Sequence, residues 1–379
     1  MPASDAPIPN YWDYLQLQPL LGLQAGADAR EEDLVADELL FIIIHQTYEL
    51  WFKMVLRELD EAIDRFAQGR VPEDKVPWVV HHLRRAGVIM RHAVNQFEVM
   101  ETLTPQDFLG FRDKLSPASG FQSFQMRELE IMLGLEDDQR ELYGKTDALT
   151  HIQHLAENSP AGALAWDRII RARSRAADGA TLKASMRRWL ARTPIHGSSP
   201  EDAGDAEMVE GYLRDYLQAL QDWQADQAER LASAGISSPE AIRAKFEASN
   251  QAARTFLQAD DVPERLRAQV KRARAGLLFI ESHRQLPLLA WPRLLVDTVV
   301  ELEEQLVLWR NRHARMVERI IGRRVGTGGS SGVEYLDRTT RARIFGDLWT
   351  VRTLLMPVDR VPPVDDESFY RFATTTRSR

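Results

Sequence analysis

Apolar side chains recur every three to four residues over long stretches of this chain, and this helical period constrains its fold more than any other feature. In residues 33–68, for example, Leu39, Ile43 and Leu50 fall on one line along a helix. Convincing segments of alternating apolar and polar residues are few, and we find no hairpin signal. The sequence therefore predicts an all-α fold.

Further helices are expected along the chain. Thr104 is a suitable N-cap for a helix that starts at Pro105. The remaining predicted helices cover residues 77–100, 121–133, 208–258, 264–281, 292–321 (ending before Gly322) and 338–355. Residues 134–207 look more polar and less regular, and no domain boundary is sharp. We expect one domain over 1–379 with a helical middle region at 134–275, and a poorly ordered tail at 358–379 after Pro357.

Composition excludes several classes of protein. The net charge of −8 over 379 residues disfavours nucleic-acid binding, which usually needs a basic surface. There is no cysteine, so thiolate metal sites, disulfides and a cysteine nucleophile are excluded. We see no signal peptide and no apolar stretch long enough for a membrane span, so we expect a cytoplasmic protein that does not enter membranes.

Two histidines lie within apolar helical segments. His45 shares one helix face with Phe41 and Tyr48, so its imidazole must either be satisfied by a neighbour or face a cavity. His313 lies among apolar positions near the end of the last long helix, and one such histidine is enough to ligate a haem iron. Taken alone, each of them is most simply a structural histidine.

Other metal sites have less support from residue spacing. No histidine has an acidic residue three positions before it, so the Glu-x-x-His pairs of a di-iron bundle are absent. His45 and Glu49 are one helical turn apart, which leaves a non-haem iron site open.

A glycine-rich segment and an arginine are the remaining candidates for ligand binding. Residues 326–332 lack the lysine of a phosphate-binding loop, but Thr327 and the backbone amides suit a small polar group. A flexible surface loop would have the same composition. Arg112 lies beside Phe108 and Phe111, where it could clamp a carboxylate or form a surface ion pair.

Several segments together resemble the haem-dependent tryptophan 2,3-dioxygenases, and they follow the family's order at both ends of the chain. They include Phe41-Ile-Ile-Ile-His45-Gln-Thr-Tyr48, Trp309-Arg-Asn-Arg-His313 and Gly326-Thr-Gly-Gly-Ser-Ser-Gly332. The other matching segments are residues 11–15, 37–53, 108–112, 115–123 and 316–322. Residues 134–275 resemble the family less.

The resemblance implies a helical protein that binds haem b, active in its ferrous form, and uses O2 as co-substrate. It implies cleavage of the indole C2–C3 bond of L-tryptophan to N-formyl-L-kynurenine, usually by a homotetramer built as a dimer of dimers. His313 would be the iron ligand, and His45 would be the distal histidine near O2 and the indole N–H.

The resemblance also assigns roles to the other matching residues. Arg112 would pair with the substrate carboxylate, and Thr327 would meet the ammonium or carboxylate group. Phe41 and Tyr48 would help to wall the indole pocket, and Ser119 and Gly120 would lie beside the haem. Tyr11 and Tyr14 would reach the active site of a neighbouring subunit.

Two rival functions remain at this stage. A haem-dependent monooxygenase acting on tryptophan or a methylated tryptophan would use the same iron ligand and carboxylate clamp. A haem sensor or a catalytically silent binding protein would have no obvious use for such a clamp.

Overall fold

The computed structural model describes residues 10–26, 30–67, 75–115, 118–140, 148–157, 159–235, 238–326 and 332–372. Helices dominate these residues, and no strand is found among them. Among the described residues, Ile195 and Ser198 form an isolated antiparallel β-bridge, which belongs to no strand. The all-α fold predicted from the helical period is confirmed.

The helices follow one another with short connections. The first group is α1 Tyr11–Tyr14, α2 Leu17–Leu21, α3 Ala36–Ala67, α4 Val76–Met100, α5 Pro105–Leu115 and α6 Phe124–Leu133. The second is α7 Ala148–Ala156, α8 Pro160–Ala177, α9 Leu182–Leu190, α10 Asp205–Ser233, α11 Pro239–Leu257 and α12 Glu264–Ser282. The last is α13 Ala290–Ile321, α14 Val333–Thr339 and α15 Gly346–Thr350.

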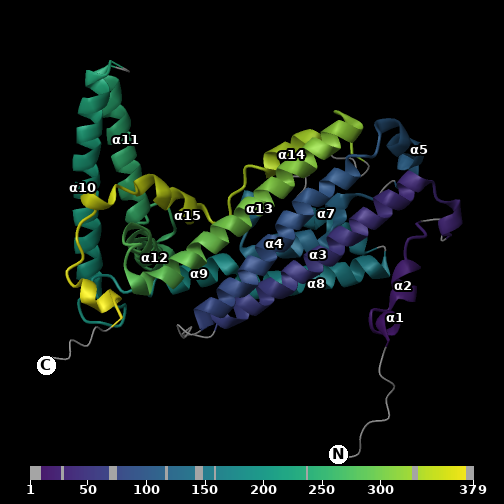
Figure 1. The fold of residues 1–379 in the computed structure, drawn as a ribbon, viewed down its shortest axis with the longest axis horizontal. Helices are drawn as coiled ribbons and strands as arrows, with labels where there is room; N and C mark the ends of the chain where they lie inside the picture. Colours follow the sequence, from purple (N-terminus) through teal and green to yellow (C-terminus); the bar gives the residue numbers. More distant parts are fainter. Residues whose placement is uncertain are drawn as a thin grey trace, which may run out of the picture.

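Three long helices form the body of the molecule, with α4 packed against both α3 and α13 (Figure 1). The hairpin of α10 and α11 stands at one end, and α1 and α2 lie at the other. Helices α5 and α14 lie at the same end of the body as the last turns of α13, away from the hairpin. This arrangement brings segments from both halves of the sequence around that end of α13.

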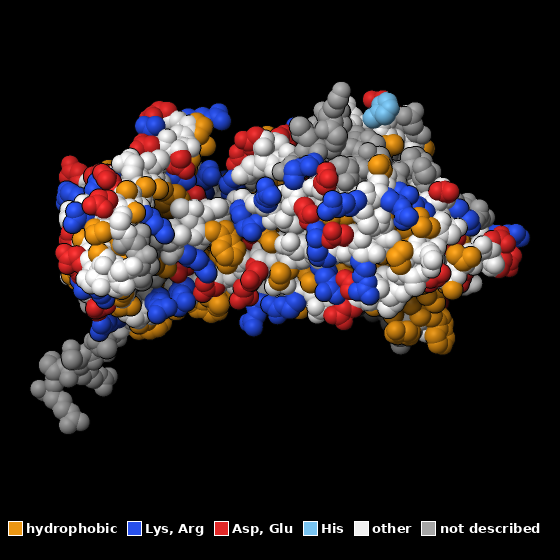
Figure 2. All heavy atoms as spheres, turned by 90° about the horizontal axis from the view of Figure 1, so that it is seen from above, with side chains coloured by type: hydrophobic (Ala, Val, Ile, Leu, Met, Phe, Trp, Pro, Cys, Tyr) orange, Lys and Arg blue, Asp and Glu red, His pale blue; other side chains and the backbone are white. Residues whose placement is uncertain are grey.

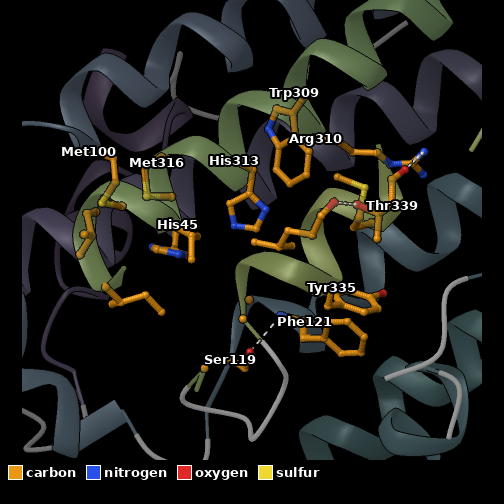
Figure 3. A pocket seen from close by; sticks show the side chains of 18 of the residues that line it. His45, Met100, Ser119, Phe121, Trp309, Arg310, His313, Met316, Tyr335 and Thr339 are labelled. Carbon is orange, nitrogen blue, oxygen red and sulfur yellow. Dashed lines mark hydrogen bonds between the residues drawn. The ribbon is translucent and has the colours of Figure 1, made fainter. Parts of the chain in front are cut away.

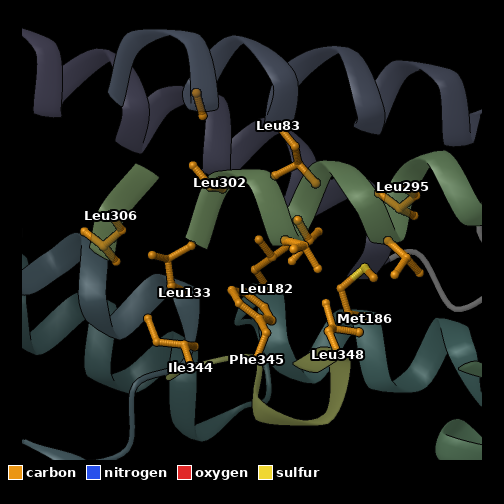
Figure 4. Close-up of a cluster of buried hydrophobic side chains, with 14 of the residues drawn as sticks. Leu83, Leu133, Leu182, Met186, Leu295, Leu302, Leu306, Ile344, Phe345 and Leu348 are labelled. Carbon is orange, nitrogen blue, oxygen red and sulfur yellow. The ribbon is translucent and has the colours of Figure 1, made fainter. Parts of the chain in front are cut away.

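The core surrounds α13 and is built mainly from aliphatic side chains of several helices, together with Met186 and Phe345 (Figure 4). Leu83 of α4, Leu182 of α9 and Leu295 of α13 are each 0% exposed. Burying one leucine contributes roughly 1.5–3 kcal/mol before the loss of chain entropy is counted. This packing holds α13, and with it His313, in a fixed position relative to α3 and α4.

Two helix ends that the sequence predicted are found in the structure. Helix α5 begins at Pro105, and the Thr104 hydroxyl accepts a hydrogen bond from the main-chain N–H of Asp107 at 3.2 Å. Helix α13 ends at Gly322, whose φ of 59° is the left-handed conformation that glycine adopts most easily. Both ends match the prediction because they depend on neighbouring residues alone.

Three segments differ from the sequence-based expectation. The region 134–207 contains three helices, α7 to α9, and two of them have an N-cap hydroxyl, Ser159 and Thr181. The helical period predicted over 208–258 is divided between α10 and α11, because Ser238 and Pro239 start a new helix. The helix expected at 338–355 is divided into α14, α15 and a short 3₁₀ segment.

The described part of the tail, residues 358–372, packs on the body. Tyr370 is 1% exposed, and its hydroxyl donates to the main-chain oxygen of Pro194 and accepts from the N–H of Gly197. Two tyrosine hydrogen bonds thus attach residues 358–372 to the turn after α9. Residues 373–379 lie outside the described residues.

Helix α3 is unusually apolar. By length and composition alone, its residues Ala36–Phe66 could cross a membrane, a feature that the sequence analysis did not anticipate. In the fold this helix packs against α4 and α6 and carries two residues of the cavity described below. The apolar side chains of its second half, such as Phe52 and Ile63, are buried in the body, whereas Ile43 and Leu50 of its first half are 43% and 52% exposed.

The surface is a mixture of both charges, with apolar side chains concentrated where α1 and α2 lie (Figure 2). Tyr11, Trp12 and Tyr14 are 70%, 62% and 75% exposed. Neither α1 nor α2 has a buried residue. These two short helices therefore present an apolar surface that the rest of the same chain does not cover.

Candidate functional site

A cavity lies between the last turns of α13 and residues of α3, α5, α6 and α14 (Figure 3). It encloses about 1260 Å³ of space free of protein atoms, including its open mouth. Most of its wall is apolar, with thioethers and rings that adapt to a flat ligand. The apolar lining residues are Phe41, Met100, Phe108, Phe121, Met126, Trp309, Met316, Val317, Ile320, Ile321 and Leu336.

His313 points from α13 into this cavity (Figure 3). Its ring packs against Trp309 at 5.1 Å and Phe97 at 5.8 Å between centroids. Burial lowers the pKa of His313 to about 4, with smaller effects from His45 and Arg127. No hydrogen bond joins its ring nitrogens to another described residue. His313 is therefore a neutral imidazole with nitrogen lone-pair capacity facing a cavity, as a metal ligand must be.

His45 lines the same cavity from α3. Its Nδ1 lies 2.8 Å from the main-chain oxygen of Phe41, which can only accept, so Nδ1 carries the proton. Burial lowers the pKa of His45, although the hydrogen bond to Phe41 and the charge of Glu49 act in the opposite direction. The neutral ring keeps a lone pair on Nε2, which can accept a hydrogen bond from a ligand.

Arg112 lines the cavity from α5 and is held by the start of the glycine-rich segment. Its guanidinium donates a hydrogen bond to the main-chain oxygen of Val325. Its Nε is buried and has no hydrogen-bond partner among the described residues. A buried N–H donor without a partner is unfavourable by about 1–3 kcal/mol, so this geometry suits a bound anion.

The two described ends of the glycine-rich segment lie beside the cavity. Gly326 and Gly332 both line it, whereas the predicted ligand Thr327 lies outside the described residues. Gly332 has a φ of +63°, and a Cβ at this position would lie 2.7 Å from the main-chain oxygen of Arg324. Only glycine permits this close approach of the two ends of the segment.

Ser119 and Gly120 also line the cavity, as the prediction for them requires. The Ser119 hydroxyl accepts a hydrogen bond from the N–H of Phe121 at 3.3 Å and thereby starts a short 3₁₀ turn. That turn places the Phe121 ring 4.9 Å from Tyr335, and both residues lie on the side of the cavity facing His313 (Figure 3).

Three predicted residues lie elsewhere. Tyr48 is not among the cavity-lining residues; it is 6% exposed, donates to the main-chain oxygen of Ala93 at 3.1 Å and packs edge-on against Trp309. Tyr48 therefore packs behind Trp309, which itself lines the cavity. Tyr11 and Tyr14 lie on the exposed helix α1, outside the cavity of their own chain.

Sequence reasoning missed the polar end of the cavity. Arg127 and Glu130 of α6 and Arg310 of α13 line it together with Thr339. The available signal was weak: Arg127 and Glu130 are three residues apart on a helix, a spacing that surface ion pairs share. Trp309, one turn before His313, also lines the cavity.

The donor set distinguishes between metal sites. The described residues contain no group of three or more His, Asp or Glu side chains that could hold a metal ion. Glu49, the partner considered for a non-haem iron, instead accepts a hydrogen bond from Gln125 at 2.8 Å. One neutral histidine over a large apolar cavity with guanidinium groups at one end fits haem, which brings its own four nitrogen ligands.

Comparisons with known proteins agree with this chemistry. The profile of one family, described as tryptophan 2,3-dioxygenase, matches residues 3–355 and so runs through the middle region 134–275. A tryptophan 2,3-dioxygenase of Sorangium cellulosum is 45% identical over 96% of this chain and 87% of its own length. Tryptophan 2,3-dioxygenase 2 of Ralstonia nicotianae is 46% identical over 96% and 98%. A tryptophan 2,3-dioxygenase-like protein of Xanthomonas campestris is 46% identical over 71% and 98%. The chain belongs to the tryptophan 2,3-dioxygenase family.

Proposed function

We propose that this chain performs the reaction of its family in the cavity between His45 and His313. The reaction is the haem-dependent cleavage of the indole C2–C3 bond of L-tryptophan by O2, giving N-formyl-L-kynurenine. The observation that carries the assignment of residues is the convergence of His45, Arg112 and His313 on one apolar cavity. His313 would hold the iron, and Ser119 and Gly120 would lie against the haem.

The haem, when bound, supplies the site at which O2 is activated toward the electron-rich indole ring. The side chains have the task of binding and orienting the substrate. Arg112 has an unpaired Nε and a charged guanidinium for the tryptophan carboxylate. Thr327 would meet the ammonium or carboxylate group from the glycine-rich segment. The Phe41 ring would lie along the indole.

His45 is suited to hold the indole N–H. Because its Nδ1 proton is used by Phe41, only Nε2 is free to accept a hydrogen bond from the substrate. Its neutral state at physiological pH follows from burial. We infer a positioning role close to the reacting ring, with no obligatory removal of a proton. Tyr48 would stiffen this wall through its contact with Trp309.

The assembly that we propose is a homotetramer in which Tyr11 and Tyr14 cover the cavity of a neighbouring subunit. The support is the exposed apolar surface of α1 and α2, which the rest of their own chain does not cover. We also propose a cytoplasmic location, with no nucleic-acid partner and no membrane. Sedimentation velocity of the full chain tests the assembly, because a monomer at micromolar concentration would contradict it.

Product analysis tests the reaction itself. The reduced haem protein is mixed with L-tryptophan under ¹⁸O2, and the product is examined by mass spectrometry. Two labelled oxygen atoms in formylkynurenine are expected. One labelled atom would identify the monooxygenase alternative, which the full-length similarity to dioxygenases does not favour. Absence of turnover would revive a sensor or binding role.

A further inference from the structure

The polar end of the cavity contains an unusual concentration of buried charge. Glu130 of α6 is 5% exposed and forms ion pairs with Arg127 at 2.9 Å, Arg140 at 3.1 Å and Arg310 at 2.9 Å. We call these four residues the Glu130 cluster. Burial raises the pKa of Glu130, but the guanidinium groups of Arg127, Arg310 and Arg140 outweigh this effect and hold its pKa below the usual range. Glu130 is therefore a carboxylate.

The charges of the Glu130 cluster do not balance. Arg140 is also paired with Asp137 at 3.3 Å, so Arg127 and Arg310, which line the cavity, share the single carboxylate of Glu130. This leaves an excess of one positive charge in a largely buried place. Buried charges without compensation are strongly unfavourable. Arg127 also has a buried Nε without a hydrogen-bond partner among the described residues. The cluster is thus incomplete without an anionic ligand.

The position of the cluster indicates what that ligand is. Arg310 lies one helical turn from His313, and Arg127 and Arg310 line the same cavity as the imidazole. In Figure 3, Arg310 and Thr339 lie on one side of His313 and His45 lies on the other. A flat ligand centred over His313 therefore reaches the cluster at one edge. Arg112, the candidate for the substrate carboxylate, donates to the main-chain oxygen of Val325 instead.

We propose that Arg127 and Arg310, positioned by Glu130, bind the propionate carboxylates of the haem. The inference rests on the proposed binding of haem at His313. A bound carboxylate would compensate the remaining positive charge and give the unpaired Nε of Arg127 an acceptor. Glu130 is a positioning group, because its carboxylate accepts a hydrogen bond from Arg310 and holds that side chain on the α6 side of the cavity. Arg310 also donates to the main-chain oxygen of Thr339 of α14 at 3.4 Å. The cluster thereby fixes the rotation of the haem about the axis through its iron.

The experiment compares two haems with different charges. Apoprotein of the full chain is titrated with ferric haem and with its dimethyl ester, and binding is followed by the Soret band. The wild-type chain should bind free haem about tenfold or more tightly than the ester, since the ester cannot form charge-assisted hydrogen bonds. Arg127→Gln and Arg310→Gln should each lose most of this preference, and Arg127→Lys should keep part of it.

Arg140→Gln is the matched control. Arg140 belongs to the same cluster, and its side chain is 5% exposed like that of Arg310, but it does not line the main cavity. This variant should keep the preference for free haem, even if its folded state is less stable. If Arg310→Gln does not fold, Arg127→Gln still tests the proposal. The Arg127 side chain is more exposed, at 15%, so its replacement should disturb the fold less. Circular dichroism of each apoprotein verifies folding.

The outcomes separate the two proposals. If free haem and its ester bind equally to the wild-type chain, or if Arg127→Gln and Arg310→Gln both keep the preference, the propionate site is refuted. In that case a Soret band that His313→Ala abolishes would leave the haem site intact. If His313→Ala binds haem with an unchanged spectrum, the haem assignment fails and the cluster proposal falls with it.

Discussion

The Nδ1–H of His45 donates a hydrogen bond to the main-chain oxygen of Phe41, one helical turn earlier, at 2.8 Å. This bond fixes the tautomer of the imidazole and holds its ring 4.0 Å from the Phe41 ring, centroid to centroid. Both residues line the cavity, so the free Nε2 and an aromatic face are offered together. An indole ring has the matching features, an N–H donor and an aromatic surface.

Replacing His45 by alanine should lower kcat by about tenfold to hundredfold, because the substrate loses an orienting hydrogen bond. The haem content should not change. A tryptophan methylated on the indole nitrogen provides the control, since it has no N–H to donate, and its slower turnover should respond little to His45→Ala. Equal losses with both substrates would argue against a bond from the indole N–H to His45.

Replacing His313 by alanine should abolish the Soret band of haem ligated by this residue, because the variant lacks the imidazole proposed to hold the iron. Asn311→Ala is the control: it lies on the same helix but is exposed. Absorbance of the purified proteins, normalised to protein concentration, measures the effect. A normal haem spectrum in the His313 variant would refute the ligand assignment.

Arg112→Gln should raise KM for L-tryptophan by roughly tenfold to hundredfold, the usual range for loss of a charge-assisted hydrogen bond. Binding of tryptamine, which has no carboxylate, should be almost unaffected. Gln106→Ala, at an exposed position of α5, should behave like the wild type. If tryptamine binding weakens as much as tryptophan binding, Arg112 acts through the fold of the cavity and not through the carboxylate.

Glu303 should contribute strongly to stability, although it touches no cavity residue named above. It is 1% exposed and accepts hydrogen bonds from the main-chain N–H groups of Ile344 and Phe345 and from Trp349 Nε1. Glu303→Ala leaves three donors unpaired and should cost about 3 kcal/mol or more of unfolding free energy. Glu304→Ala, the exposed neighbour, should cost little. Equal unfolding curves for the two variants would contradict the role of Glu303.

His283 should make the fold sensitive to acid. It is 3% exposed, and burial together with nearby His196 lowers its pKa from 6.5 to about 4. The unfolded chain then binds more protons between these two values, so stability falls as the pH decreases through this window. From pH 7 to pH 5 the contribution is on the order of 2 kcal/mol.

Urea unfolding at pH 7 and pH 5 measures this effect. His283→Asn should lose less stability over this interval than the wild-type chain does. His154→Asn is the control, because the His154 side chain is 77% exposed. Contributions from other buried histidines are common to all three proteins and cancel in the comparison. An unchanged pH dependence in His283→Asn would contradict the prediction.

Local sequence patterns predicted the helical class and several helix ends, because these depend on residues a few positions apart. The caps at Thr104 and Gly322 are examples. Patterns were less informative between 134 and 207, where the apolar face of α9, with Leu182, Met186 and Leu190, extends over only nine residues. They were also less informative at Tyr370, where order comes from two long-range hydrogen bonds. Neither of these bonds leaves a trace in the neighbouring sequence.

The sequence by itself determined the family, since the segments around His45 and His313 carry residue types in a specific order. It also determined that both histidines would lie in apolar helices. Only the tertiary structure decided that Arg127, Glu130 and Arg310 form a buried cluster at one end of the same cavity. In the sequence these residues look like ordinary surface charges. Their burial depends on the position of α6, which packs against α3 and α8 and is joined to α13 by the ion pair of Glu130 and Arg310. Side chains distributed over the whole chain set this arrangement.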